Sequence, residues 1–365
     1  MNKKKTNRQQ SILLLVCIGM VLAAVACFGG WIWLSRLLPS QKEAERWQGD
    51  GEMPFKQISC FVPMDAMITL EQIGNFRTAA MTKLKEGSMD VSGDQILMMD
   101  CWSTIGKVNA VGEHGKGEAS VIAVGGNYFD FHPLRLLSGD YLHPDDLMQD
   151  RVLLDENLSW LLFGGTDLQG KTVKINGVPY VVAGVIERET DFASSRTYDP
   201  EEMTMFMSYE GLRAFDENLK INCYEYVLAN PVKSFAVNVG REKFPVKTAE
   251  ILCNTDRYDF YRLLSDVVLK FGSRSTHSSG VLYPYWENAA RITEDWAGLC
   301  CLMMVVLPIF PAIMGGIWLI GALRRGKKKM DEEILPEAKE KTEEAIRVRQ
   351  RRRWERKHGL HEKQD

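Results

Sequence analysis

Two long stretches without a charged residue constrain this chain more than any other feature. They are Ile12–Leu34 and Trp296–Leu323. An α-helix rises about 1.5 Å per residue, so each stretch is long enough to cross a hydrocarbon core about 30 Å thick. We therefore assign transmembrane helices to residues 12–36 and 296–323. The 37–295 region between them has the composition of a soluble domain.

Basic residues flank both apolar stretches on the sides that face away from the central region. Lys3, Lys4, Lys5 and Arg8 precede the first stretch, and a basic cluster at 324–329 follows the second. Short cationic flanks stay in the cytoplasm. The pattern predicts a two-pass protein of the cell membrane with residues 1–11 and a charged, helical tail at 324–365 in the cytoplasm. Residues 37–295 are then extracytoplasmic.

A cleaved signal peptide is the alternative for the first stretch. Its apolar part is longer than the usual core of a signal peptide, and no clear small-residue cleavage site follows it. Residues 24–27 are similar to a lipoprotein processing site, but a larger aliphatic residue is expected where Ala24 stands. We favour the membrane anchor.

No motif in the sequence has the context of a catalytic or cofactor site. There is no Gly-x-Ser-x-Gly elbow and no 12-residue calcium loop. Residues 165–172 match the letters Gly-x-x-x-x-Gly-Lys-Thr, but a strand is expected after them, whereas a phosphate-binding loop opens a helix. Asp145 and Asp146 are expected to begin a helix rather than to hold calcium, and Asp155 with Glu156 to cap one. The histidines are scattered and no Cys-x-x-Cys occurs. We therefore expect no enzyme activity, no catalytic residue, no metal and no cofactor, and the net charge of -3 gives no reason to expect nucleic acid.

Four of the eight cysteines fall in the region expected to be extracytoplasmic: Cys60, Cys101, Cys223 and Cys253. An even number on the oxidising side of a membrane permits two disulfides. Four buried thiols are the equal alternative.

Helix and strand patterns alternate along the central region. On its N-terminal side, a strand at 56–62, a helix at 69–86 and a strand at 95–102 are expected. On its C-terminal side, a strand at 222–228, a helix at 232–242 and a strand at 248–253 are expected, followed by a helix at 256–271. Between them lie a strand at 152–155, a helix at 156–163, a hairpin of 172–175 with 180–186 across Asn176–Gly177, and a strand at 204–208. The pattern predicts a β-α-β unit on each side of a mainly β piece.

Five short motifs in the middle of the chain carry a family resemblance. They are Gly126-Asn127-Tyr128-Phe129, the turn from Leu136 to Tyr141, Leu162-Phe163-Gly164, Gly170-Lys171, and the hairpin from Ile175 to Val185. Their order resembles the extracytoplasmic core domain of MacB-type ABC transporter permeases.

The resemblance implies an α+β extracytoplasmic domain. A porter-like subdomain, at about 55–125 and 205–271, is then split by an inserted, mainly β subdomain at about 126–204. Because neighbouring strands of one β-α-β unit would bring each pair close, we expect disulfides, if formed, to join Cys60 with Cys101 and Cys223 with Cys253.

The resemblance also implies a function. The family couples ATP hydrolysis in the cytoplasm to movement of a domain outside, and expels peptides, antibiotics or lipoproteins. In it, two further membrane helices follow the second one. No apolar span follows Leu323 here, so we expect a truncated form without the downstream permease half.

The leading interpretation is a non-catalytic, permease-like subunit whose outer domain binds partner proteins or cargo in an efflux complex. Its expected partners are an ABC ATPase, a full-length permease, a membrane-fusion-type adaptor and membrane lipid. The alternative is a membrane-anchored extracytoplasmic sensor or scaffold without transport activity.

Overall fold

The computed structural model describes residues 2–87, 96–197, 199, 201–271 and 281–357. These fall into two units, one of Cys27–Leu302 and one of Met1–Ala26 with Met303–Asp365. The strands, all in the first unit, are β1 (Phe55–Phe61), β2 (Met98–Val111), β3 (Lys116–Gly126), β4 (Leu136–Gly139), β5 (Arg151–Asp155), β6 (Thr172–Ile175), β7 (Val178–Ile186), β8 (Thr204–Ser208), β9 (Cys223–Ala229) and β10 (Glu250–Cys253).

Helices of varied length precede, connect and follow these strands. They are α1 (Asn2–Leu34), η1 (Pro39–Gln41), α2 (Glu43–Gln48), α3 (Leu70–Glu86), α4 (Tyr128–Phe131), α5 (Glu156–Phe163), η2 (Ser194–Arg196), α6 (Tyr209–Arg213), α7 (Phe235–Lys243), α8 (Phe260–Arg262), η3 (Leu263–Val268), α10 (Tyr285–Val306), α11 (Ile309–Lys329), η4 (Met330–Ile334) and α12 (Leu335–Lys357).

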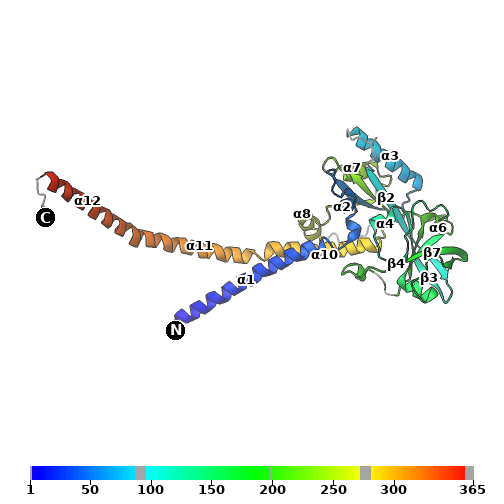
Figure 1. The fold of residues 1–365 in the computed structure, drawn as a ribbon, viewed down its shortest axis with the longest axis horizontal. Coiled ribbons are helices and arrows are strands. Elements are labelled where there is room, and N and C mark those ends of the chain that lie inside the picture. Colours follow the sequence, from blue (N-terminus) through cyan, green and yellow to red (C-terminus); the bar gives the residue numbers. More distant parts are fainter. Residues whose placement is uncertain (1, 88–95, 198, 200, 272–280, 358–365) are drawn as a thin grey trace, which may run out of the picture. The chain divides into compact units, whose positions relative to one another are not determined.

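The ten strands form one mixed sheet whose first part has the order β10-β1-β9-β2. Helix α3 connects β1 to β2 and helix α7 connects β9 to β10, so two β-α-β units interleave in the split arrangement of ferredoxin-like folds. Helices α3 and α7 lie side by side against this part of the sheet (Figure 1). Phe76 of α3 is fully buried there and its ring packs against Tyr224, Tyr226 and Phe244. The expected β-α-β units and α+β fold are confirmed.

The second part of the sheet closes on itself. From β2 the order runs through β3, β8, β5 and β7, and the short strand β6 pairs with both β7 and β2. These six strands therefore form a small barrel with its own core of mostly aliphatic side chains. Strands β2 and β3, which we expected in the porter-like part, therefore pair with strands of both parts of the sheet.

Local signals explain the element boundaries. Thr69 and Gln72 form a reciprocal capping box at the start of α3, and Gly87 follows its last turn. Asp155 caps α5 by accepting a hydrogen bond from the Leu158 amide, as expected. The β6–β7 hairpin turns at Asn176 and Gly177, both with positive φ, as a two-residue primed turn requires.

Three expected elements differ from the structure. The strand expected at 95–102 starts at Met98 and continues to Val111, while Gln95 lies outside the described residues. The helix expected at 256–271 is confined to α8 and the π-helical turn η3. Asp145 and Asp146 lie in a turn and begin no helix.

Among the residues that the structure describes, two helices are long and apolar enough to cross a membrane. By length and composition these are Gln10–Leu34 and a continuous helical run within Tyr285–Arg356. The charged tail is helical through Lys357, in the end of α11, η4 and α12, and residues 358–365 lie outside the described part.

The cysteine pairing expected from the sequence does not match the strand order. Strand β9 lies between β1, which carries Cys60, and β2, which carries Cys101. Strand β1 likewise lies between β9, with Cys223, and β10, with Cys253. All four are free thiols in the structure. The physical reason is the interleaving, since the strands of one β-α-β unit are separated by a strand of the other.

Alkylation of the denatured but unreduced protein is expected to modify all four of these thiols. A disulfide needs Cβ atoms about 3.5–4.5 Å apart, whereas one intervening strand separates two others by about 9.6 Å. Peptide mass mapping measures the modification at each position. A cross-linked peptide containing Cys60 and Cys101 would contradict this strand order.

Candidate binding cleft and its anchor

A cleft of ≈ 440 Å³ opens where β2 and β3 meet α4 and α6. The segment before β5 forms its opposite wall. Its volume falls within the range of about 300–1,000 Å³ that small-ligand sites occupy.

Glycines allow the cleft to form against a tryptophan ring. A methyl group at Gly125 would lie 2.3 Å from the Trp102 ring, so only glycine fits there. Gly126 has φ +63 and lies close to the Asp100 carbonyl, to which the Asn127 amide donates a hydrogen bond of 3.0 Å. The turn from β3 into α4 is thus held against β2.

A fixed cation borders the cleft. Arg77 of α3 donates from Nε and Nη2 to the two carboxylate oxygens of Asp100, at 2.6 and 2.7 Å. The Tyr224 hydroxyl donates to the same carboxylate at 2.6 Å. The hydrogen bond to Asp100 raises the pKa of Arg77 above its ordinary value although burial lowers it. The guanidinium stays charged, lies 5.3 Å from the centre of the Trp102 ring, and joins α3 to β2 at the cleft.

Three buried polar atoms at the cleft have no hydrogen-bond partner among the described residues. They are Trp102 Nε1, Asp146 Oδ2 and Gln149 Oε1. Nearby, Arg151 Nη1 lies 3.9 Å from Asp146 Oδ1, and its side chain is half exposed. Buried polar groups are nearly always satisfied in proteins. One donor and two acceptors beside an aromatic ring therefore suit a ligand that carries amide or hydroxyl groups.

A buried ion pair fastens α10 to the sheet. Arg257, which follows β10, is fully buried and donates from Nη1 and Nη2 to the two oxygens of Glu287 on α10, each at 2.7 Å. Its Nε lies 2.8 Å from Glu294, about two turns further along the same face of α10. Burial lowers the pKa of Arg257, but the charges of Glu287 and Glu294 outweigh that effect and raise it well above the ordinary value.

A second arginine extends this contact to β10. Arg291 Nε donates to Glu287 Oε1 at 2.7 Å and its Nη2 to Glu250 Oε1 at 3.0 Å. Its guanidinium stacks 3.9 Å from the centre of the Tyr283 ring. The last turn of α1 reaches the same region, because Trp31 Nε1 donates to the Tyr258 carbonyl at 3.0 Å. The end of one apolar helix and the beginning of the other are thus both attached to the segment after β10.

Sequence reasoning found one part of this region and missed another. Gly126, Asn127, Tyr128 and Phe129, quoted above as a motif, line the cleft. The four cysteines do not line it. Arg77 and Arg257 were not singled out, because their partners lie far away in the sequence. A signal for the anchor was present in Glu287, Arg291 and Glu294, which have helical spacing just before the second apolar stretch.

Replacing Glu287 by Gln is expected to lower the free energy of unfolding by about 3 kcal/mol, because Arg257 stays buried without its full counter-charge. Urea denaturation of the full chain in detergent, followed by tryptophan fluorescence, measures this change. Glu118→Gln is the matched control, since Glu118 pairs with Lys107 at the exposed surface and its loss should leave the midpoint unchanged. Equal midpoints for both variants would show that the anchor is not stabilising.

Comparison with known proteins identifies the domain that carries the cleft. Residues 71–237 match the family model of the MacB-like periplasmic core domain. The chain is 34% identical over 73 residues to the macrolide export ATP-binding/permease protein MacB of Neisseria gonorrhoeae, covering 20% of this chain and 11% of that protein. It is 36% identical over 78 residues to the MacB protein of Aggregatibacter actinomycetemcomitans, covering 21% and 12%. The match thus spans about a tenth of the length of these curated relatives.

Two solved structures are also similar. The periplasmic region of MacB from Actinobacillus actinomycetemcomitans aligns with a TM-score of 0.39 and 17% identity, over 61% of this chain and 94% of that one. The extracellular domain of the noncanonic ABC-type transporter YknZ from Gram-positive bacteria aligns with a TM-score of 0.37 and 14% identity, over 54% and 99%. The chain is a membrane protein with an extracytoplasmic domain. The domain that carries the cleft is thus similar to the periplasmic core domain of MacB-type proteins.

Proposed function

We propose that this chain is a non-catalytic, permease-like subunit of an ABC-type export complex, whose outer domain binds a partner protein or cargo in the cleft. The match of residues 71–237 to the MacB-like periplasmic core domain carries this proposal. The relatives named above are export proteins that combine ATP-binding and permease parts. ATP hydrolysis would then come from a separate ATPase subunit, and a full-length permease and a membrane-fusion-type adaptor are the other expected partners.

Charge at the ends of the chain supports the orientation. The basic residues before the first apolar helix and after the second are of the kind that stays in the cytoplasm. With both termini inside, the sheet and its cleft face the extracytoplasmic side. The cationic tail is then near the inner leaflet, where it can contact anionic lipid.

The cleft chemistry supports binding as the role of the outer domain. Unsatisfied polar atoms of Trp102, Asp146 and Gln149 offer directional contacts, and the Trp102 ring offers an apolar surface. Arg151 adds a half-exposed positive charge at the rim. A peptide segment has the matching amide groups and side chains, and its carboxylates would pair with Arg151.

The anchor supports transmission between the outer domain and the membrane. Rigid elements joined by buried, charge-assisted hydrogen bonds move together rather than slide. The ion pairs of Arg257 with Glu287 and Glu294 therefore allow a shift of α10 to be passed to β10 and the neighbouring strands.

Photo-crosslinking in cells tests the binding role. A photoreactive phenylalanine analogue at Leu147, which is 97% exposed beside the cleft residue Asp146, should capture a specific protein or peptide. The same analogue at Val232, exposed but outside the cleft lining, should capture none. In addition, Arg151→Glu should reduce the Leu147 product at least about tenfold by reversing the rim charge, while the surface control Arg135→Glu should not.

Purification in mild detergent tests the transport role of the same chain. An ABC ATPase should copurify with the wild type. Recovery of the ATPase with no effect of Arg151→Glu would support the complex and contradict the cleft as the binding surface. Recovery of signalling or scaffold proteins without any ATPase would contradict the transport role and favour the sensor or scaffold alternative.

A further inference from the structure

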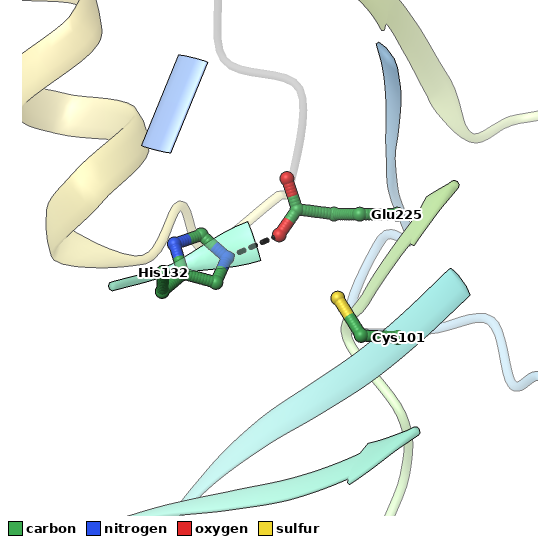
Figure 2. Close-up of side chains that lie close together, drawn as sticks. All are labelled: Cys101, His132 and Glu225. Atoms are coloured by element: carbon green, nitrogen blue, oxygen red, sulfur yellow. Dashed lines mark hydrogen bonds and ion pairs between the residues drawn. The ribbon is translucent and has the colours of Figure 1, made fainter. Parts of the chain in front are cut away.

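Three side chains with metal-ligating atoms meet inside the outer domain, on the face of the sheet opposite α3 and α7. Cys101 of β2 and Glu225 of β9 are direct partners in the antiparallel register, so both side chains leave the same face. His132 follows α4, and its Nε2 lies 2.5 Å from Glu225 Oε2. The cysteine sulfur, the imidazole nitrogen and the carboxylate oxygen all lie within 4.8 Å of one another (Figure 2).

The cluster is withdrawn from solvent. His132 is 2% exposed, and Cys101 and Glu225 are each 1% exposed. The rings of Tyr128 and Trp286 each lie with their centres 4.5 Å from the centre of the His132 ring. A charged carboxylate is costly in such a place unless a counter-charge is bound.

A supporting shell orients the carboxylate. Glu225 Oε1 accepts a hydrogen bond from the Ser59 hydroxyl at 2.6 Å, and Ser59 accepts one from Asn254 Nδ2 at 2.7 Å. Protein metal sites typically hold their carboxylate ligands by such outer hydrogen bonds. These hydrogen bonds leave Glu225 Oε2 directed to His132. Oε2 is the oxygen that a cation would bind.

The ligand types and their separations select the metal. Thiolate, imidazole and carboxylate together are a zinc set, whereas calcium and magnesium bind oxygen ligands. Around tetrahedral zinc, with bonds of about 2.0–2.3 Å, ligand atoms lie about 3.3–3.6 Å apart. The observed cluster, with one separation of 2.5 Å and none above 4.8 Å, reaches that size by side-chain adjustments of about an ångström.

We propose that Cys101, His132 and Glu225 form a zinc site that joins β2, β9 and the segment after α4. The zinc would replace the hydrogen bond between His132 and Glu225, and binding would release the thiol proton of Cys101. Burial, and secondarily the charge of Glu225, raises the pKa of the Cys101 thiol well above its ordinary value.

The site connects to the cleft by position. Asn127, Tyr128 and Phe129 line the cleft and come from the same short segment as His132, while Tyr128 also stacks on the His132 ring. A metal ion that fixes the position of His132 would therefore also fix one wall of the cleft. The zinc site itself does not depend on the transport role and would exist in a sensor or scaffold as well.

Cobalt titration of the full chain in detergent, after treatment with a chelator, tests the site. One equivalent of Co²⁺ should produce a thiolate-to-metal charge-transfer band in the near ultraviolet, and added Zn²⁺ should remove it. Cys101→Ser should abolish this band, and Glu225→Gln should weaken metal binding more than about tenfold. Cys60→Ser is the matched control. Cys60 is also buried, on strand β1 next to β9. Its side chain leaves the sheet on the face opposite to Ser59, which hydrogen-bonds Glu225, and therefore points away from the cluster.

Two results would overturn the proposal: no thiolate band from folded wild-type protein, or a band that persists in Cys101→Ser. Near-ultraviolet circular dichroism checks that each variant is folded. If Cys101→Ser does not fold, zinc-edge X-ray absorption of the zinc-loaded wild type decides instead. One sulfur neighbour at about 2.3 Å with nitrogen and oxygen neighbours supports the site, and a shell without sulfur contradicts it.

Discussion

Arg257 is the cation on which the connection between the outer domain and its second apolar helix depends. It is fully buried, and Glu287, Glu294 and Gln41 supply its contacts from α10 and from the segment after α1. A buried ion pair of this kind adds little stability compared with an apolar replacement, but breaking it on one side is costly. The ion pair therefore fixes one arrangement of α10 relative to the segment after β10. That property suits a domain that must move with a membrane helix more than it suits a passive tether.

The interleaved sheet places two chemically different regions on either side of the short helix α4. On one side, Tyr128 and its neighbours form a wall of the cleft. On the other, His132 reaches the carboxylate of Glu225 in the buried cluster. Because both regions share the turn after β3, the glycines at 125 and 126 determine the position of each.

Local features of the fold were predictable from the sequence. Helix α5 and strand β8 have the expected bounds, and the turn at Asn176–Gly177 is where its dipeptide placed it. Pairings between distant segments were not predictable by the same reasoning. The place of β9 between β1 and β2, and the closure of β6 onto β2, depend on contacts across more than 60 residues. For this reason the cysteine pairing was misjudged, and the Cys101–His132–Glu225 cluster was overlooked.

Membrane topology tests the central claim, which is that the cleft-bearing domain lies outside a membrane that both apolar helices cross. Single cysteines introduced at Leu147 and Lys341, both highly exposed, can be labelled on intact cells with a membrane-impermeant maleimide. The parent chain, whose own extracytoplasmic thiols are buried, gives the background. We predict labelling of Leu147→Cys on intact cells and of Lys341→Cys only after permeabilisation. Labelling of Lys341→Cys on intact cells, with Leu147→Cys protected, would contradict the account.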